Sequence, residues 1–209
     1  IIVRAPLPPA LFEDARKLRA AIRHGAGLDM IPIEAATQAG VLVANVPAVN
    51  ASTVAEHVMM VSLMLSRRFR MVDSDLRTQS WAKARAHSDY GRDLGGRTMG
   101  IVGMGSVGRA VLKIARDGFG LDVMTFTRTA SSVPEGVTAA DLDTLVESAD
   151  IMVLCCPLTP ETRGLISRDR IARMKPDALL VNVARGAVVD EDALAEALAE
   201  GRIGGAALD

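Results

Sequence analysis

Three glycines at fixed spacing form the clearest chemical pattern in the sequence. Gly103, Gly105 and Gly108 make a G-x-G-x-x-G between a short apolar run and a helix-like run. In such a turn the first glycine permits a tight bend, the second lets the backbone approach a pyrophosphate, and the third lets helix and strand pack closely. The N–H groups that open the helix then face the phosphates. The pattern predicts a dinucleotide-binding turn, and the alternative is a glycine-rich surface turn.

The position that would read the adenosine ribose carries no carboxylate. About 20 residues beyond such a motif, an acidic residue binds the ribose 2′-OH of NAD, whereas an arginine holds the 2′-phosphate of NADP. Thr127, Arg128 and Thr129 stand there. Two hydroxyls and a guanidinium suit a phosphate dianion. We therefore expect NADP to be preferred and NAD to be possible. The alternative is that Arg128 faces solvent and NAD is accepted.

One arginine at the end of a later strand is the candidate for binding a carboxylate. Arg185 follows the apolar run 179–183 and precedes Gly186, so we expect its guanidinium near the nicotinamide end of a bound dinucleotide. A guanidinium forms two parallel bonds with a carboxylate and polarises an adjacent carbonyl, but it keeps its proton and cannot be a general acid. The alternative is a surface arginine paired with Asp190 or Glu191, a contact of small energetic value.

A second glycine turn, His24 to Asp29, directly follows the strand-like run 19–23. Backbone amides at the carboxyl end of a parallel strand are placed to bind ligands. A tight turn that needs positive φ accounts for the glycines equally well. Both interpretations stay open on these residues alone.

Alternating apolar and helix-like runs predict an α/β fold with two sheets. Residues 94–209 fit a doubly wound parallel sheet, and residues 1–50 fit a piece of another parallel sheet. In the first segment we expect strands at 1–3, 19–23 and 42–44, and helices at 9–15 and 32–39. In the second we expect strands at 98–102, 122–127, 151–154, 178–183 and 204–208, and helices at 106–117, 141–148, 167–174 and 191–200.

Right-handed crossovers place the loops after these later strands on one edge of the sheet. We expect a common crevice lined by 103–108, 127–129, 155–162, 184–186 and Asp209.

Residues 51–93 connect the two segments as a long helix and an interdomain linker. We expect the helix from Thr53 to about Arg70, capped by Ser52 or Thr53, with Glu56 completing a capping box. The polar stretch 81–93 is expected to be an irregular linker.

Composition excludes several classes of protein. The 209 residues carry a formal net charge of −1, which leaves no electrostatic footprint for nucleic acid. The longest nearly apolar run, Val58 to Leu65, is too short to span a membrane. Cys155 and Cys156 are adjacent, so in a strand their side chains point to opposite faces; this argues against a disulfide framework and fits a reducing cytoplasm. Both chain ends are strand-like, so we expect an internal portion of a longer polypeptide.

Five motifs stand in the order seen in one enzyme family. They are Gly25-Ala26-Gly27-Leu28-Asp29, Asn50 with Val54-Ala55-Glu56, the glycine motif 103–108, Pro157-Leu158-Thr159-Pro160-Glu161-Thr162, and the stretch 182–191 around Arg185. The chain resembles the D-isomer-specific 2-hydroxyacid dehydrogenases over nearly its whole length. The resemblance implies a Rossmann nucleotide domain at 94–209, part of a flavodoxin-like substrate domain at 1–50, a nicotinamide cofactor, no metal, a homodimer, and a small 2-oxo acid substrate such as glyoxylate, hydroxypyruvate or 3-phosphohydroxypyruvate.

The resemblance also implies roles for particular residues. Amides near Ala26 and Gly27 would hold the substrate carboxylate, and Arg185 would be the catalytic residue that binds carboxylate and carbonyl. The family's proton-exchanging histidine and its glutamate partner fall after the position that matches Asp209. The cofactor would contact Gly103, Gly105, Ser106, Val107, Thr127, Arg128, Thr129, Cys156, Pro157, Thr162, Val183, Ala184 and Asp209.

Two departures from the family pattern are Ser106, where many members have arginine, and Cys155-Cys156, where a histidine is frequent before the proline. A second class of protein shares the motifs. Corepressors of the C-terminal-binding-protein type resemble the same fold and use the dinucleotide as an assembly signal. That alternative would need a peptide groove, which no pattern in the sequence reveals.

Overall fold

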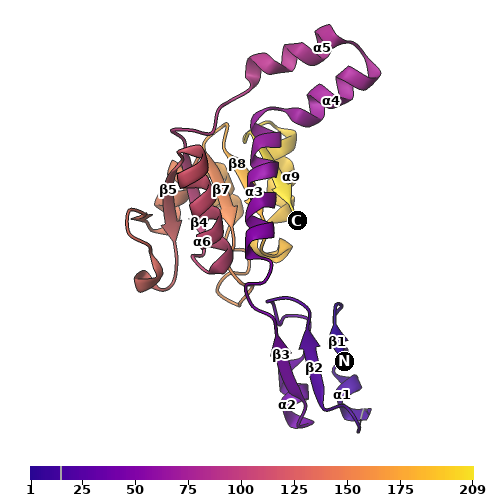
Figure 1. Cartoon of the computed structure of the whole chain (residues 1–209). Coiled ribbons are helices and arrows are strands. Elements are labelled where there is room, and N and C mark those ends of the chain that lie inside the picture. The colour runs from indigo at the N-terminus through magenta and orange to yellow at the C-terminus, as the bar shows by residue number, and fades with distance from the viewer. Residues whose placement is uncertain (15) are drawn as a thin grey trace. The chain divides into compact units, whose positions relative to one another are not determined.

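The computed structural model describes residues 1–14 and 16–209. The chain divides into two compact units, Ile1–Asn50 and Ala51–Asp209. Figure 1 shows the elements of each unit along the chain. The predicted functional residues other than Ala26 and Gly27 all belong to the second unit.

The first unit is a parallel sheet with helical crossovers, as predicted. Its strands lie in the order β1-β2-β3, and the helices bury Phe12 and Ala36 against Val3 and Ala21 of the sheet. The predicted helix 9–15 is α1, and residue 15 lies outside the described residues. The bounds are β1 (Ile2–Val3), α1 (Ala10–Asp14), β2 (Ala20–Arg23), α2 (Ile33–Gln38) and β3 (Leu42–Asn45).

The second unit is built on a parallel sheet that has six strands among the described residues, in the order β6-β5-β4-β7-β8-β9. The strand order reverses between β4 and β7, which is the switch point where a doubly wound sheet binds its ligand. The prediction of a Rossmann-type sheet is confirmed. The bounds are β4 (Thr98–Val102), β5 (Asp122–Phe126), β6 (Thr138–Ala139), β7 (Ile151–Leu154), β8 (Leu179–Asn182) and β9 (Gly205–Leu208).

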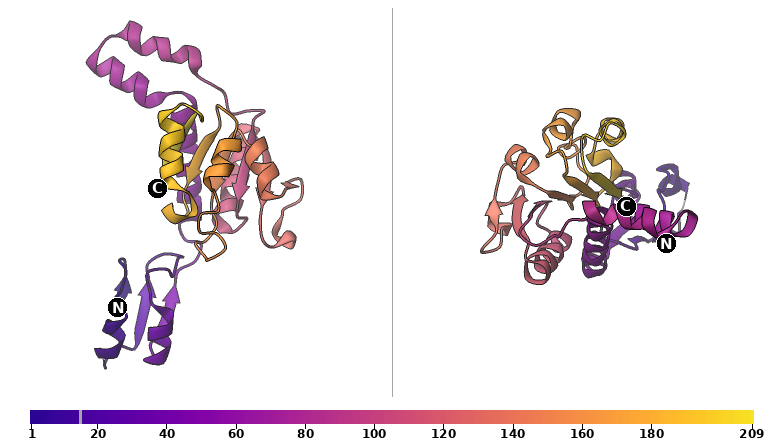
Figure 2. Two further views of the ribbon diagram at one scale, coloured as in Figure 1. Left: turned by 180° about the vertical axis from the view of Figure 1, so that it is seen from behind. Right: turned by 90° about the horizontal axis from the view of Figure 1, so that it is seen from above.

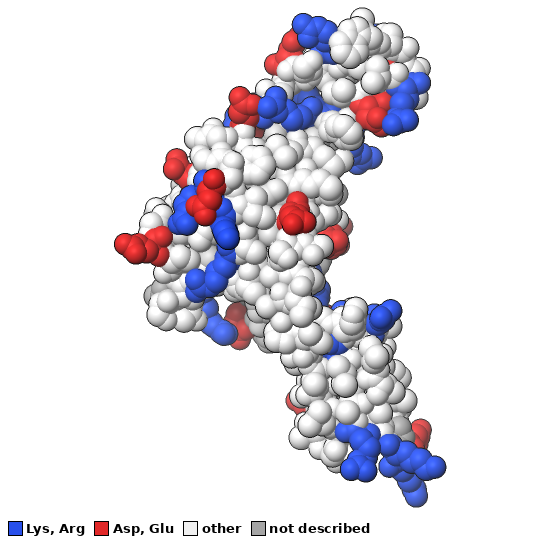
Figure 3. All heavy atoms as spheres, in the orientation of Figure 1, with Lys and Arg blue, Asp and Glu red and all other residues white. Residues whose placement is uncertain are grey.

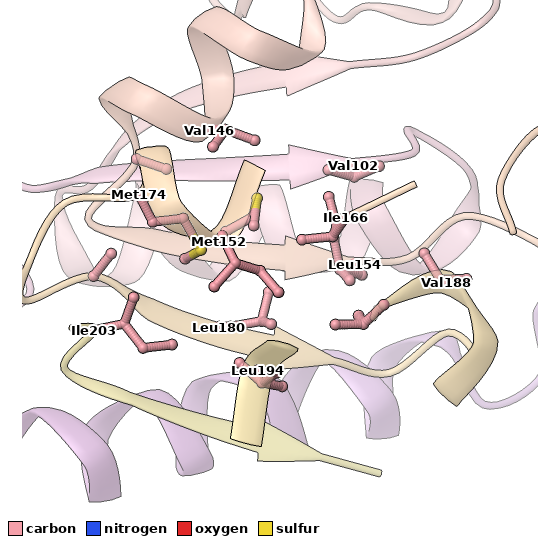
Figure 4. Packing of buried hydrophobic residues seen from close by; sticks show 14 of the residues in the cluster. Val102, Val146, Met152, Leu154, Ile166, Met174, Leu180, Val188, Leu194 and Ile203 are labelled. Carbon is pink, nitrogen blue, oxygen red and sulfur yellow. The ribbon is translucent and has the colours of Figure 1, made fainter. Parts of the chain in front are cut away.

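Helices cover both faces of this sheet because its central strands are apolar on both sides. In β7, Ile151 and Val153 face α3 and α6, whereas Met152 and Leu154 face α7, α8 and α9. Figure 4 shows the second of these clusters, with Met152, Leu154 and Leu180 at its centre. The bounds are α3 (Ala51–Ser66), α6 (Ser106–Lys113), α7 (Leu142–Ser148), α8 (Arg168–Arg173) and α9 (Glu191–Ala199).

The helix predicted at 53–70 differs at both ends. It begins at Ala51, which is buried, so Thr53 and Glu56 lie inside the first turns and the predicted capping box is wrong. It ends at Ser66 because Arg68 adopts a left-handed conformation, with φ 51°.

The irregular linker predicted at 81–93 is wrong for residues 81–90, which are helical, whereas residues 91–93 belong to no helix or strand. Helix α4 (Phe69–Thr78) and helix α5 (Trp81–Ala86) pack side by side, and a 3-10 turn follows at His87–Tyr90. Ser80 caps α5 by accepting a hydrogen bond from the Lys83 N–H, at 3.3 Å. We call residues 69–86 the hairpin; it extends away from the sheet at the end where the strands begin (Figures 1 and 2).

Charges are interspersed on the face of the molecule drawn in Figure 3, where acidic and basic side chains alternate with wide uncharged areas. Among the described residues, no helix has both the length and the apolar character needed to cross a membrane.

Candidate active site

The glycine turn is fitted tightly between the ends of neighbouring strands. Gly103 has φ +98°, and its N–H donates to the Phe126 carbonyl at the end of β5, at 2.8 Å. A Cβ on Gly103 would lie 3.0 Å from the Cα and the N of Cys156, just after β7. Only glycine fits both the backbone conformation and this approach.

The other two glycines of the motif differ sharply in the space around them. A Cβ on Gly108 would lie 2.2 Å from the Gly103 carbonyl oxygen, so the bare glycine lets α6 touch the turn. A Cβ on Gly105 would have no neighbour within 4 Å. Gly105 therefore borders open space at the start of α6.

That open space fits a pyrophosphate. Gly105 is the N-cap of α6 and has no side chain to accept from the first N–H groups of the helix. The first of the helical hydrogen bonds runs from Arg109 N to the Gly105 carbonyl, at 3.0 Å. The amides of Ser106 and Val107 thus open the helix, where the backbone and the helix dipole favour an anion.

The loop after β5 holds the hydroxyls of Thr127 and Thr129 and an exposed arginine, Arg128; whether these residues bind a phosphate stays a prediction. Thr127 Oγ1 lies 3.2 Å from Ser132 Oγ, and Ser132 Oγ donates to the Thr129 carbonyl at 2.6 Å. Arg109 reaches this loop from α6 and donates to the Ser132 carbonyl at 2.7 Å. The sequence does not predict the hydrogen bond between Arg109 and Ser132, because it joins segments that are distant along the chain.

The two cysteines after β7 point to opposite faces, as predicted. Cys155 packs against the cluster under α3 and α6, and Cys156 belongs to the cluster under α7, α8 and α9. Burial and, after it, the neighbouring Cys156 raise the pKa of the Cys155 thiol to about 12, and burial also raises the pKa of Cys156. Both are uncharged thiols at neutral pH.

The loop after the cysteines is closed by one threonine. Thr162 Oγ1 donates to the Pro157 carbonyl at 2.7 Å and accepts from the Thr159 N–H at 2.8 Å. Thr162 therefore shapes the loop from within. Its predicted contact with a cofactor remains a prediction.

A buried asparagine shapes the loop that carries Arg185. Asn182 Nδ2 donates to the Arg185 carbonyl at 2.9 Å, and Asn182 Oδ1 accepts from the Ala184 N–H at 2.9 Å. Arg185 is half-buried, and its Nη1 donates to the Ala184 carbonyl at 2.7 Å. The sequence marks Asn182 only as part of the motif around Arg185, whereas these contacts give it a positioning role.

The two carboxylates considered as surface partners of Arg185 lie in the same region. Asp190 Oδ1 accepts from the Ala193 N–H at 3.0 Å and caps α9. The Glu191 carboxylate packs on Gly186, because a Cβ on that glycine would lie 2.4 Å from Glu191 Oε1.

The predicted cofactor residues of the second unit share one edge of its sheet. Each follows a strand: 103–107 follow β4, 127–129 follow β5, 156–162 follow β7, 183–185 follow β8, and Asp209 follows β9. The Asp209 N–H donates to the Asn182 carbonyl at 3.0 Å, which ties the last of these positions to the loop of Arg185.

The predicted substrate amides lie in the first unit, in the turn after β2. The Ala26 carbonyl accepts from Asn45 Nδ2 at 2.7 Å, and the Gly25 carbonyl accepts from the Val46 N–H at 3.1 Å. These bonds tie the turn to the end of β3. The turn thus lies at the carboxyl edge of its own sheet.

A family model described as "D-isomer specific 2-hydroxyacid dehydrogenase, NAD binding domain" matches residues 59–209. The chain belongs to this family. It is 40% identical, over 202 residues, to a glyoxylate/hydroxypyruvate reductase B of Pectobacterium carotovorum. The match covers 95% of this chain and 63% of that protein. The chain therefore spans less than two thirds of that relative's length.

Solved structures of related enzymes share the fold of the whole chain. A NAD-dependent formate dehydrogenase from Staphylococcus aureus in complex with NAD gives a TM-score of 0.91 at 31% identity, covering 100% of this chain and 64% of that one. An acyclic imino acid reductase in complex with NADPH and D-Arg gives a TM-score of 0.89 at 26% identity, covering 100% of this chain and 66% of that one. Both NAD and NADPH thus occur among the structural neighbours.

Proposed function

We propose that the whole protein reduces a small 2-oxo acid to a 2-hydroxy acid with a reduced nicotinamide dinucleotide. The observation that carries the proposal is the shared edge of the six-stranded sheet, where the open helix start at Gly105 and the loop of Arg185 both lie. The relative from Pectobacterium acts, by its name, on glyoxylate and hydroxypyruvate, which supports those substrates. The substrate 3-phosphohydroxypyruvate stays a further option.

Each part of the edge has a separate task in this proposal. The bound cofactor would supply the hydride that adds to C2 of the substrate. The amides of Ser106 and Val107 would bind the pyrophosphate, and the half-buried guanidinium of Arg185 would bind the substrate carboxylate and polarise its 2-oxo group. The first unit would serve as part of the substrate domain, with Ala26 and Gly27 binding the carboxylate.

A panel of 2-oxo acids tests the activity. The whole protein should oxidise reduced cofactor with glyoxylate, hydroxypyruvate or 3-phosphohydroxypyruvate. Oxidation with none of the panel, together with intact dinucleotide binding, would favour the dinucleotide-sensing corepressor alternative. The relatives described above are enzymes, which favours the first outcome.

We propose further that NADPH is preferred over NADH. Thr127, Arg128 and Thr129 present hydroxyls and a guanidinium after β5, and no carboxylate stands among these three to accept the 2′-OH of NAD. Thr127→Asp combined with Arg128→Ala should shift kcat/KM toward NADH. A wild-type protein that favours NADH tenfold, about 1.4 kcal/mol, would contradict the preference.

We propose a reducing compartment such as the cytoplasm for the protein, because its two cysteines, Cys155 and Cys156, are adjacent in the sequence.

We also propose that the protein forms a homodimer whose interface buries the hairpin. Phe69, Leu76 and Trp81 are exposed by 50%, 51% and 70%. Helix α4 has no buried residue, so the hairpin cannot cover its own apolar side chains. A second copy would cover both hairpins at once by two-fold symmetry. Sedimentation should give a dimer for the wild type and a monomer for Trp81→Ser with Leu76→Ser; a wild-type monomer contradicts this proposal.

A further inference from the structure

Two loops flank the glycine turn on the side where an adenosine ribose would bind. Strand β4 lies between β5 and β7, so the loop after β5 (127–132) and the loop after β7 (155–165) stand on either side of 103–105. The first loop carries Arg128. The second loop carries Glu161, a carboxylate that the proposed function leaves without a role.

Glu161 is an exposed carboxylate whose charge is maintained by its surroundings. A hydrogen bond from the Thr159 side chain and, more weakly, the positive charge of Arg128 hold the pKa of the Glu161 carboxyl below its usual range. Thr159 is itself placed by Thr162, whose Oγ1 accepts from the Thr159 N–H at 2.8 Å. Glu161 is therefore ionised at neutral pH and lies within electrostatic reach of Arg128.

The two loops thus carry arginines, hydroxyl groups and the Glu161 carboxylate. Arg109 is tied to the Ser132 carbonyl at 2.7 Å, which anchors the first loop to α6. Arg128 is exposed beside Thr127 and Thr129. A 2′-phosphate arriving here would meet the guanidinium of Arg128, and it would also meet the negative charge that already interacts with that guanidinium.

We propose that Glu161 is a specificity-determining residue that weakens the binding of NADPH relative to NADH. Its carboxylate opposes a 2′-phosphate by competing for Arg128 and by repelling the phosphate charge, whereas the uncharged 2′-OH of NADH meets no such opposition. The proposal rests on the proposed dinucleotide site and adds a second determinant to it, on a different loop from Arg128.

The size of the effect follows from the exposure of the groups. A carboxylate and a phosphate dianion that are both exposed repel each other only weakly, because water screens their charges. We therefore expect a change of about two- to five-fold in affinity, which is the range of exposed charge pairs. Because salt screens exposed charges, the effect should shrink as ionic strength rises.

The test is the affinity of Glu161→Gln for NADPH and for NADH, measured directly by the fluorescence of the bound reduced nicotinamide at low and at high salt. The matched control is Glu200→Gln. It removes the same charge from an exposed glutamate just after α9. Glu200 lies shortly before the start of β9, whereas the proposed dinucleotide site lies where the strands end. We expect Glu161→Gln to bind NADPH about two- to five-fold more tightly at low salt, with NADH unchanged and with the control unchanged for both.

Three results would overturn the proposal. The first is an NADPH affinity that is unchanged or weaker in Glu161→Gln. The second is a weaker NADH affinity alone, which would instead assign Glu161 to the ribose hydroxyls. The third is an equal gain in Glu200→Gln, which would show a general effect of net charge.

The same titrations separate this proposal from the proposed function. A wild type that favours NADH, but whose Glu161→Gln variant gains affinity for NADPH alone, contradicts the cofactor preference and supports the role of Glu161. A wild type that binds neither dinucleotide overturns the proposed function and this proposal together.

Discussion

Gly105→Ala should separate dinucleotide binding from folding. A Cβ at Gly105 would meet no atom within 4 Å, and φ is −80°, which alanine adopts without strain. The free energy of unfolding should therefore change by less than about 1 kcal/mol. The methyl group would instead occupy the space through which a pyrophosphate reaches the first amides of α6.

The cost in binding can be worked out from the bonds that the methyl group would block. A hydrogen bond to a charged group is worth about 1.5–3 kcal/mol. Displacing the pyrophosphate from one amide should therefore weaken binding by about 10- to 150-fold. The loss should be the same for NADH and NADPH, because both carry the pyrophosphate.

Isothermal titration with each cofactor measures the affinity, and denaturant unfolding without cofactor measures the stability. Gly118→Ala is the matched control, because its Cβ would lie 3.9 Å from the Ile114 side chain, an ordinary contact beyond the far end of α6. Unchanged affinity in Gly105→Ala, or a loss of stability as large as the loss of affinity, would refute the reasoning.

Three further variants or treatments test the surroundings of the site. Gly108→Ala should lower the unfolding free energy by about 1–3 kcal/mol in denaturant titrations, because its Cβ would meet a backbone oxygen at 2.2 Å; an unchanged midpoint would contradict this. Burial alone would raise the pKa of Asp150, but bonds from the Thr98 N–H and Lys175 outweigh it and lower that pKa. Its stabilising effect is thus present above about pH 4 and lost as the pH falls through the lowered value, so Asp150→Asn should show a smaller loss of stability between pH 7 and pH 3 than the wild type. Iodoacetamide at pH 8 should label neither Cys155 nor Cys156 in the native protein and both after unfolding, as mass spectrometry would show.

The central strands could be predicted closely because they are continuous apolar runs bounded by glycine or polar residues. Strands β4 and β7 match their predicted ranges, since both faces of each strand are buried. The short edge strand β6 was not predicted, because two exposed residues carry no periodic signal.

Helix α4 was not predicted because its apolar residues Phe69, Val72 and Leu76, although at helical spacing, stand among charged residues, and none of them is buried. Helix α5 buries Ala84 alone among its residues and depends on the Ser80 cap and on contact with α4. A polar run of this kind resembles a linker until its packing partner is known. The long helix was overextended for a related reason, since its end is set by the backbone conformation of Arg68.

The sequence predicts those parts of the candidate site that depend on local spacing. It does not predict the contacts between segments that are distant along the chain. The glycine turn and the positions after each strand follow from the motif and the crossover rule. The bond from Arg109 to Ser132 joins α6 to the loop after β5, and no spacing in the sequence encodes it. The roles of Arg185 and of the cofactor residues remain predictions.

The most direct test of the central claim is kcat/KM for the best 2-oxo acid with wild-type and Arg185→Ala whole protein. A guanidinium that binds the carboxylate and the reacting carbonyl should be worth about 10²- to 10³-fold, near 3–4 kcal/mol, so Arg185→Ala should lose that much while its affinity for the dinucleotide stays unchanged. Arg185→Lys should also be impaired, because an ammonium cannot form two parallel bonds. A kcat/KM of Arg185→Ala within tenfold of the wild type would contradict the account.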